Sequence, residues 1–332
     1  MTATMTATNR SRPLTRRDAL RLLGLAGAGA FLGTAVARAA DAREAAQPTG
    51  SNSLAGAQPG FYRFSVGSVE ALALSDGGFA MPPADSPFGV GEPREKVAEA
   101  LRDGLVPADL VRIPITVPLF RLGSELILVD AGCGSAFGDA GGRLLTNMAA
   151  AGVKPEQVTA VIISHMHGDH FGGLLDAAGK PVFKNAALFM HRTEHAYWTE
   201  KGDAGVQTYL NAFKGKWQLV SGGEKLLGGL EIVEAFGHTP GHIGVTITSG
   251  SEQLYHFVDI AHNHVLSFAH PEWVLQFDVQ SDVAIATRKR LYDRCATDRT
   301  RVCGTHMPFP GLGRVRRAGA AYEYVIEPWI SA

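Results

Sequence analysis

After residue 39 the sequence lacks any apolar run long enough to cross a membrane, and the chain contains only three cysteines. A helical span needs roughly 20 consecutive apolar residues, so we expect no membrane span. Cys133, Cys295 and Cys303 are too few for a disulfide framework, and none has the spacing of a metal-binding pair. We expect buried thiols, with a disulfide between Cys295 and Cys303 as the alternative.

Basic charge is also scarce once the first 39 residues are set aside. Those residues carry six basic side chains and one acidic side chain, so the remainder has 25 basic and 31 acidic side chains and a net charge of −6. Proteins that bind nucleic acids usually present an excess of Lys and Arg to the phosphates. The charge therefore argues against a nucleic-acid partner.

The first 39 residues have the pattern of an export signal. Arg16 and Arg17 precede a mildly apolar run at residues 22–36, which is followed by Ala37-Arg38-Ala39. A basic start, a short apolar stretch and an A-x-A cleavage site are typical of a secretory signal peptide, and paired arginines indicate the twin-arginine export machinery. We therefore expect a periplasmic or secreted protein.

The rest of the chain divides into a linker and one domain. Residues 40–59 are rich in Ala, Gly, Ser and Pro, which predicts a flexible linker, and residues 60–332 form the domain. Apolar patterning predicts strands at residues 62–66, 69–74, 113–122, 125–130, 158–163, 187–191, 225–236, 243–249, 253–259 and 301–304. Helices are predicted at residues 95–103, 142–151, from 194 onward, and at 281–296 with Ser281 as its cap, and a Pro-rich loop at residues 81–93 over the site. Strands gathered in each half with helices between them favour an α/β fold of two stacked sheets with helices outside, an αββα sandwich.

The most informative motif is His165-Met166-His167-Gly168-Asp169-His170, which follows the β-branched run at residues 158–163. The motif is thus expected in a loop at the carboxyl end of a buried strand, where a rigid sheet aims side chains into a cleft. Imidazole is the commonest metal ligand, and His combined with carboxylate suits zinc and other divalent transition ions. The alternative is a histidine-rich surface loop.

Further histidines downstream argue against that alternative. They lie in Gly237-His238-Thr239-Pro240-Gly241-His242 and in Gly304-Thr305-His306, with Phe257-Val258-Asp259 between them. This order of ligands resembles that of the metallo-β-lactamase fold. The resemblance implies that one metal is held by His165, His167 and His238, a second metal by Asp169, His170 and His306, and that Asp259 bridges both.

The resemblance implies two divalent ions, zinc first, with manganese, cobalt or iron as alternatives. Two such ions can bridge one water and lower its pKa, so that the resulting hydroxide attacks a carbonyl or phosphoryl centre of a small-molecule substrate. Asp169 could also take up a proton there. His242 shapes its turn or buttresses a ligand. Asp130 either orients a ligand loop or is a turn residue at a strand end.

Beyond the ligands, the chain resembles the branch of this family that contains methyl parathion hydrolase and related lactone hydrolases. The likeness includes Ala73-Leu74-Ser75-Asp76-Gly77, Leu128-Val129-Asp130-Ala131-Gly132 and Phe309-Pro310-Gly311-Leu312-Gly313. It implies that Phe137 and Trp198 line an apolar pocket for the leaving group, with core positions as the alternative. It also makes a homodimer an expectation.

Two residues depart from the methyl parathion hydrolase pattern. His262 stands three residues after Asp259, where that enzyme has an apolar residue and homoserine-lactone hydrolases have tyrosine. A histidine there could donate to a carbonyl oxygen or a leaving alkoxide. Together with Phe277, which is larger than its counterpart, it would narrow a pocket for bulky phosphotriesters. We therefore expect a lactone or aryl-ester hydrolase with weaker phosphotriesterase activity.

Several other functions share the fold. A phosphotriesterase is the nearest alternative, followed by a β-lactamase or a glyoxalase II-like thioesterase. A persulfide dioxygenase is a further alternative and would be recognised by one bound iron and by oxygen consumption. A metal-binding periplasmic protein without turnover is the alternative of another class, and a missing ligand would favour it.

The export signal gives a first prediction. Replacing Arg16 and Arg17 with Lys keeps the charge but removes the paired arginines, so the variant should accumulate in the cytoplasm. Fractionation followed by immunoblotting measures the distribution. A normal periplasmic yield would contradict the twin-arginine assignment.

Overall fold

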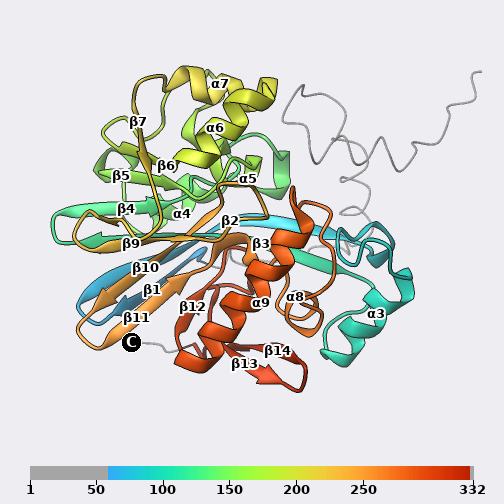
Figure 1. Cartoon of the computed structure of the whole chain (residues 1–332). Coiled ribbons are helices and arrows are strands. Elements are labelled where there is room, and N and C mark those ends of the chain that lie inside the picture. The colour runs from blue at the N-terminus through green and yellow to red at the C-terminus, as the bar shows by residue number, and fades with distance from the viewer. Residues whose placement is uncertain (1–58, 330–332) are drawn as a thin grey trace, which may run out of the picture.

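The computed structural model describes residues 59–329. The signal predicted for residues 1–39 and nearly all of the linker predicted for residues 40–59 lie outside this part. The described residues form two facing seven-stranded sheets with helices on their outer surfaces (Figure 1). The prediction of an αββα sandwich is therefore confirmed.

The first sheet follows chain order. Its strands β1 to β4 are antiparallel, and β4 to β7 are parallel. The strands are β1 Phe61–Val66, β2 Val69–Met81, β3 Val111–Leu122, β4 Glu125–Val129, β5 Ala160–Ile163, β6 Ala187–His191 and β7 Trp217–Val220.

The second sheet repeats this arrangement in part. Strands β8 to β11 are antiparallel, β11 and β12 are parallel, and β12 to β14 are antiparallel again. The strands are β8 Lys225–Leu226, β9 Leu230–Glu234, β10 Ile243–Ser249, β11 Glu252–His256, β12 Arg301–Cys303, β13 Leu312–Ala318 and β14 Ala321–Ile326.

Helices complete the four layers. Ile127 and Ile162 of the first sheet join Val245 of the second in a buried cluster between the sheets. On the outer faces, Met148 of α4 packs against the first sheet, and Leu291 of α9 against the second. The helices are α3 Arg94–Asp103, α4 Leu144–Ala150, α5 Gly168–Phe171, α6 Arg192–Lys201, α7 Ala204–Ala212, α8 Leu266–Ala269 and α9 Ser281–Asp298. Among residues 59–329, no helix is both long and apolar enough to cross a membrane.

The structure differs from the sequence predictions at several elements. Helix α7 and strands β7, β13 and β14 were not predicted. Strand β13, for example, is highly charged and carries no clear apolar alternation. Ser281 does not cap α9, since the N-cap residue is Gln280 and no side chain caps that helix end. All three cysteines are buried free thiols, so Cys295 and Cys303 form no disulfide.

The carboxyl ends of several strands meet at one edge of the sandwich. Asp130 follows β4, His165 follows β5, and His306 follows β12. Two backbone hydrogen bonds join the sheets at this edge: Ile243 N donates to Ser164 O at 3.1 Å, and Thr116 N donates to Thr305 O at 2.9 Å. The motif loops of both halves are therefore held side by side.

Candidate metal centre

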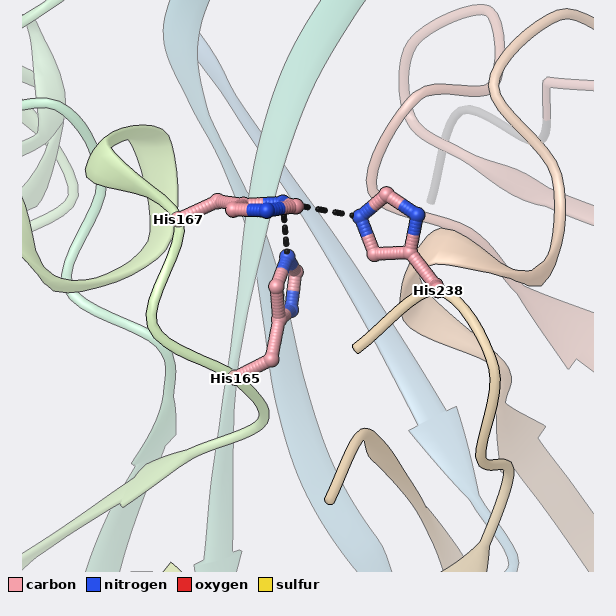
Figure 2. A group of neighbouring side chains, drawn as sticks. All are labelled: His165, His167 and His238. Carbon is pink, nitrogen blue, oxygen red and sulfur yellow. Dashed lines mark hydrogen bonds between the residues drawn. The ribbon is translucent and has the colours of Figure 1, made fainter. Parts of the chain in front are cut away.

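Three imidazoles from two loops point toward one another (Figure 2). His167 Nδ1 lies 3.1 Å from His165 Nε2 and 2.9 Å from His238 Nε2. His165 and His167 come from the loop between β5 and α5, whereas His238 comes from the loop after β9. The two halves of the chain thus supply one group of nitrogen atoms.

A second group lies beside the first. Asp169 and His170 stand in α5, and His306 follows β12. Asp169 Oδ2 is 3.5 Å from Nε2 of His170 and 3.5 Å from Nε2 of His306. Within each group the candidate ligand atoms all lie within 4.8 Å of one another.

Asp259 lies between the two groups. Its Oδ2 atom is 3.3 Å from Nε2 of both His170 and His238, and 3.1 Å from Nε2 of His306. The same oxygen is 3.7 Å from His165 Nε2 and 2.9 Å from His262 Nε2. Five imidazoles therefore surround one carboxylate oxygen.

Burial and the charges within the cluster together set its electrostatics. It lowers the pKa of His165, His167 and His238 well below the ordinary value, so these rings are neutral and have a free lone pair. Burial also lowers the pKa of His170, but the neighbouring carboxylates outweigh it and hold that pKa well above the usual range. Burial would raise the pKa of Asp259, yet the surrounding imidazoles hold it well below its usual value.

Several buried atoms of the cluster make no hydrogen bond to any described residue. These are His170 Nε2, Asp259 Oδ1 and both ring nitrogens of His262. Buried polar atoms almost always have a partner, so such a group of polar atoms without hydrogen bonds fits a divalent cation. The residues present therefore have the chemistry and the proximity to hold a divalent metal.

Hydrogen bonds behind the ligands fix their orientation. His170 Nδ1 donates to Asp130 Oδ2 at 2.8 Å, and the same carboxylate accepts from the amide and hydroxyl of Ser164 at 2.7 and 2.8 Å. His306 Nδ1 donates to Pro114 O at 2.7 Å. In each case the bond uses Nδ1 and leaves Nε2 facing the cluster.

His242 lies behind the centre and in none of the ligand groups. Its Nδ1 donates to Ala235 O at 2.8 Å, and its Nε2 accepts from the backbone amide of Asp259 at 3.2 Å. His242 therefore supports the backbone of a candidate ligand.

The aromatic residues predicted for the pocket lie around the cluster in different environments. Trp198 is buried, with its ring 6.2 Å from that of His167. Phe137 is partly buried against Phe79, with ring centroids 5.1 Å apart. Phe277 is partly buried, and its ring is 6.4 Å from that of His262.

Glu194 of α6 was missed by the sequence analysis. It is fully buried, and each oxygen accepts two hydrogen bonds. Oε1 accepts from Met166 N at 2.8 Å and Trp198 Nε1 at 2.6 Å, while Oε2 accepts from Thr239 Oγ1 at 2.7 Å and Gly241 N at 2.9 Å. One carboxylate thus joins both loops that carry the histidines of Figure 2. No local motif marks it, because three of its four partners are distant in sequence.

Comparison with known proteins agrees with this geometry. Residues 113–273 match the family model described as Metallo-beta-lactamase superfamily. The chain therefore contains a metallo-β-lactamase superfamily domain. Its relatives are metal-dependent hydrolases, among them lactonases.

Three relatives indicate the closeness of the match. The structure of AidC, a dizinc quorum-quenching lactonase in complex with a product, superposes with a TM-score of 0.78 at 28% identity, covering 82% of this chain and 99% of that one. The hydrolase AbOPH gives a TM-score of 0.76 at 27% identity, covering 83% and 100%. An N-acyl homoserine lactonase of Bacillus cereus is 24% identical over 172 residues, which are 45% of this chain. That alignment spans 64% of the relative's length, just under two thirds.

The position of Glu194 gives a prediction. In Glu194→Gln the amide nitrogen must face an N–H of either Trp198 and Met166 or Gly241, so buried donors lose their acceptor. We expect a loss of about 2–4 kcal/mol in the free energy of unfolding, measured by urea denaturation. Glu200→Gln, an exposed glutamate of the same helix, is the matched control. Equal stability of the two variants would refute the linking role.

Proposed function

We propose that this protein is a dinuclear zinc hydrolase of lactones and aryl esters, with phosphotriesters as weaker substrates. The observation that carries the proposal is the position of Asp259, whose Oδ2 lies between the two candidate ligand groups. His165, His167 and His238 would hold one ion, and Asp169, His170 and His306 the other. Bound ions would supply a water of lowered pKa and a Lewis acid for the substrate carbonyl.

One side of the cluster is more exposed to solvent than the others. Asp169 and His167 are only partly buried, whereas the other candidate ligands are buried. A substrate therefore approaches from the side of these two residues. Asp169 is placed to accept a proton from the attacking water, and the ester C–O bond then breaks as the alkoxide oxygen gains a proton.

His262 supplies a hydrogen-bond donor next to the centre. It is buried, its Nε2 lies 2.9 Å from Asp259 Oδ2 and its Nδ1 has no hydrogen-bond partner among the described residues, and its ring stacks on that of His306 at 5.0 Å. Burial lowers its pKa, which keeps the ring neutral with a single N–H. Such a group can donate to a carbonyl oxygen or a leaving alkoxide, as a lactone requires.

The relatives favour the same substrate class. AidC is a lactonase, and several curated relatives are N-acyl homoserine lactonases. Phe277 beside His262 supports a narrow pocket with one apolar wall, which suits a flat ring better than a bulky phosphotriester. We also propose that the protein is exported to the periplasm and that it forms a homodimer.

The metal count is the first prediction from this function. Protein incubated with zinc and dialysed should retain two equivalents by elemental analysis. Asp259→Ala should lose at least one equivalent and more than about 100-fold in lactone kcat/KM, beyond the 10–100-fold typical of residues that only orient ligands. Asp109→Ala, an exposed aspartate, is the control and should retain both equivalents. Retention of two equivalents by Asp259→Ala would contradict the bridging role.

Substrate preference is tested by kcat/KM for dihydrocoumarin and for methyl paraoxon, with two equivalents of zinc restored. We expect the lactone value to be the higher one. His262→Leu should lower lactone turnover by about 100-fold, the cost of one donor to a developing oxyanion, and raise phosphotriester turnover.

His264→Leu is the matched control, since this neighbour is partly exposed and lies outside the ligand groups. A wild-type preference for methyl paraoxon would make the protein a phosphotriesterase. Two bound zinc ions without turnover of either substrate would favour a thioester or β-lactam substrate, or a metal-binding protein without catalysis.

A further inference from the structure

A buried charge pair lies on the far side of His238 from the other imidazoles. His238 Nδ1 donates to Asp278 Oδ1 at 2.9 Å, and Asp278 Oδ2 accepts from Arg288 Nη2 at 3.1 Å. The side chains of Asp278 and Arg288 are 0% and 4% exposed. A buried pair of this kind is costly to desolvate, and losing one partner leaves the other charge unpaired.

Arg288 does more than neutralise Asp278. Its Nε donates to Ile260 O at 2.9 Å, and its Nη1 donates to Pro271 O at 3.1 Å and Trp273 O at 3.2 Å. Ile260 directly follows Asp259, and Trp273 lies in the segment that leads to Asp278. The guanidinium of Arg288 therefore connects the backbone next to Asp259 to the segment that contains Asp278.

The loop that carries His238 rests on the same elements. Val279 N donates to His238 O and Gln280 N donates to Gly237 O, both at 2.9 Å. Gly237 has φ 125°, and a Cβ there would lie 2.2 Å from Ala284 N of α9, so only glycine allows this close approach. Backbone and side-chain contacts thus fix His238 against the start of α9.

From these contacts we infer that Asp278 and Arg288 are positioning residues that set the metal affinity of the site formed by His165, His167 and His238. The bond from Nδ1 to Asp278 fixes the ring tautomer, so that the Nε2 lone pair faces His167 and Asp259. Arg288 holds Asp278 and Ile260 at fixed positions relative to each other. It thereby aligns His238, which is bonded to Asp278, with Asp259, which precedes Ile260. The planar, forked guanidinium makes four bonds that a lysine ammonium cannot reproduce.

This inference rests on the metal centre of the proposed function. The test measures zinc affinity by competition with a chromophoric chelator in the wild type, Arg288→Lys and Asp278→Asn. In each variant we expect one of the two zinc equivalents to bind about 10–100-fold more weakly and the other to be unchanged. The absorption spectrum of the cobalt-loaded variants should shift as well, because the geometry at one ion changes.

Arg294→Lys is the matched control, since Arg294 lies on the same helix and, within residues 59–329, forms an ion pair only with Asp298, at 3.8 Å on the helix surface. It should bind both equivalents as the wild type does. Lactone activity of the two test variants should fall at limiting zinc and recover in excess zinc. A merely structural role would lower the melting temperature of the metal-free protein without changing zinc affinity or the cobalt spectrum.

The outcomes separate the two proposals. Wild-type protein that binds no zinc refutes the proposed function. Two tightly bound equivalents in the wild type and in both variants refute the positioning role alone. Should Arg288→Lys fail to fold, Asp278→Asn decides the question, because the amide keeps the size of the carboxylate and one acceptor oxygen.

Discussion

The carboxylate of Asp259 is the group around which the site is built, with five imidazole nitrogens within 3.7 Å of one oxygen. So many imidazole nitrogens converging in a dry environment are unfavourable unless a cation fills the space between them. The two sheets, the inter-sheet hydrogen bonds at their edge and the strand-end loops together hold these rings in place. Stability of the fold and competence for metal binding are therefore linked.

Buried carboxylates behind the ligands provide that rigidity. Asp130 holds His170, Asp278 holds His238, and Glu194 joins the two loops of Figure 2. Each carboxylate has its acceptor capacity largely used by backbone amides, hydroxyls, imidazoles or a guanidinium, so burial does not leave it unpaired. Helices α6 and α9 contribute Glu194 and Arg288 from the two outer layers, so the packing of both layers reaches the site.

Specificity in this family depends on what surrounds a shared set of ligands. Here His262 and Phe277 come from the segment after β11, which is also anchored by Arg288 through Ile260 and Trp273. The residues proposed to select the substrate and those proposed to orient a ligand thus share one buried support. Changes in this segment would affect substrate preference and metal affinity together.

The sandwich and the set of candidate ligands could be predicted from the sequence, because the histidines and aspartates stand in short motifs that resemble those of a known family. The supporting residues could not, since Glu194 is 28 and 45 residues from Met166 and Thr239, and Asp278 is 40 residues from His238. A lone Glu, Asp or Arg in a helix or loop looks like any exposed charge until packing removes it from water. The sequence by itself determined which side chains can bind metal. Only the tertiary structure decided which buried charges hold them, because that choice depends on chain segments that meet through packing and not through proximity in sequence.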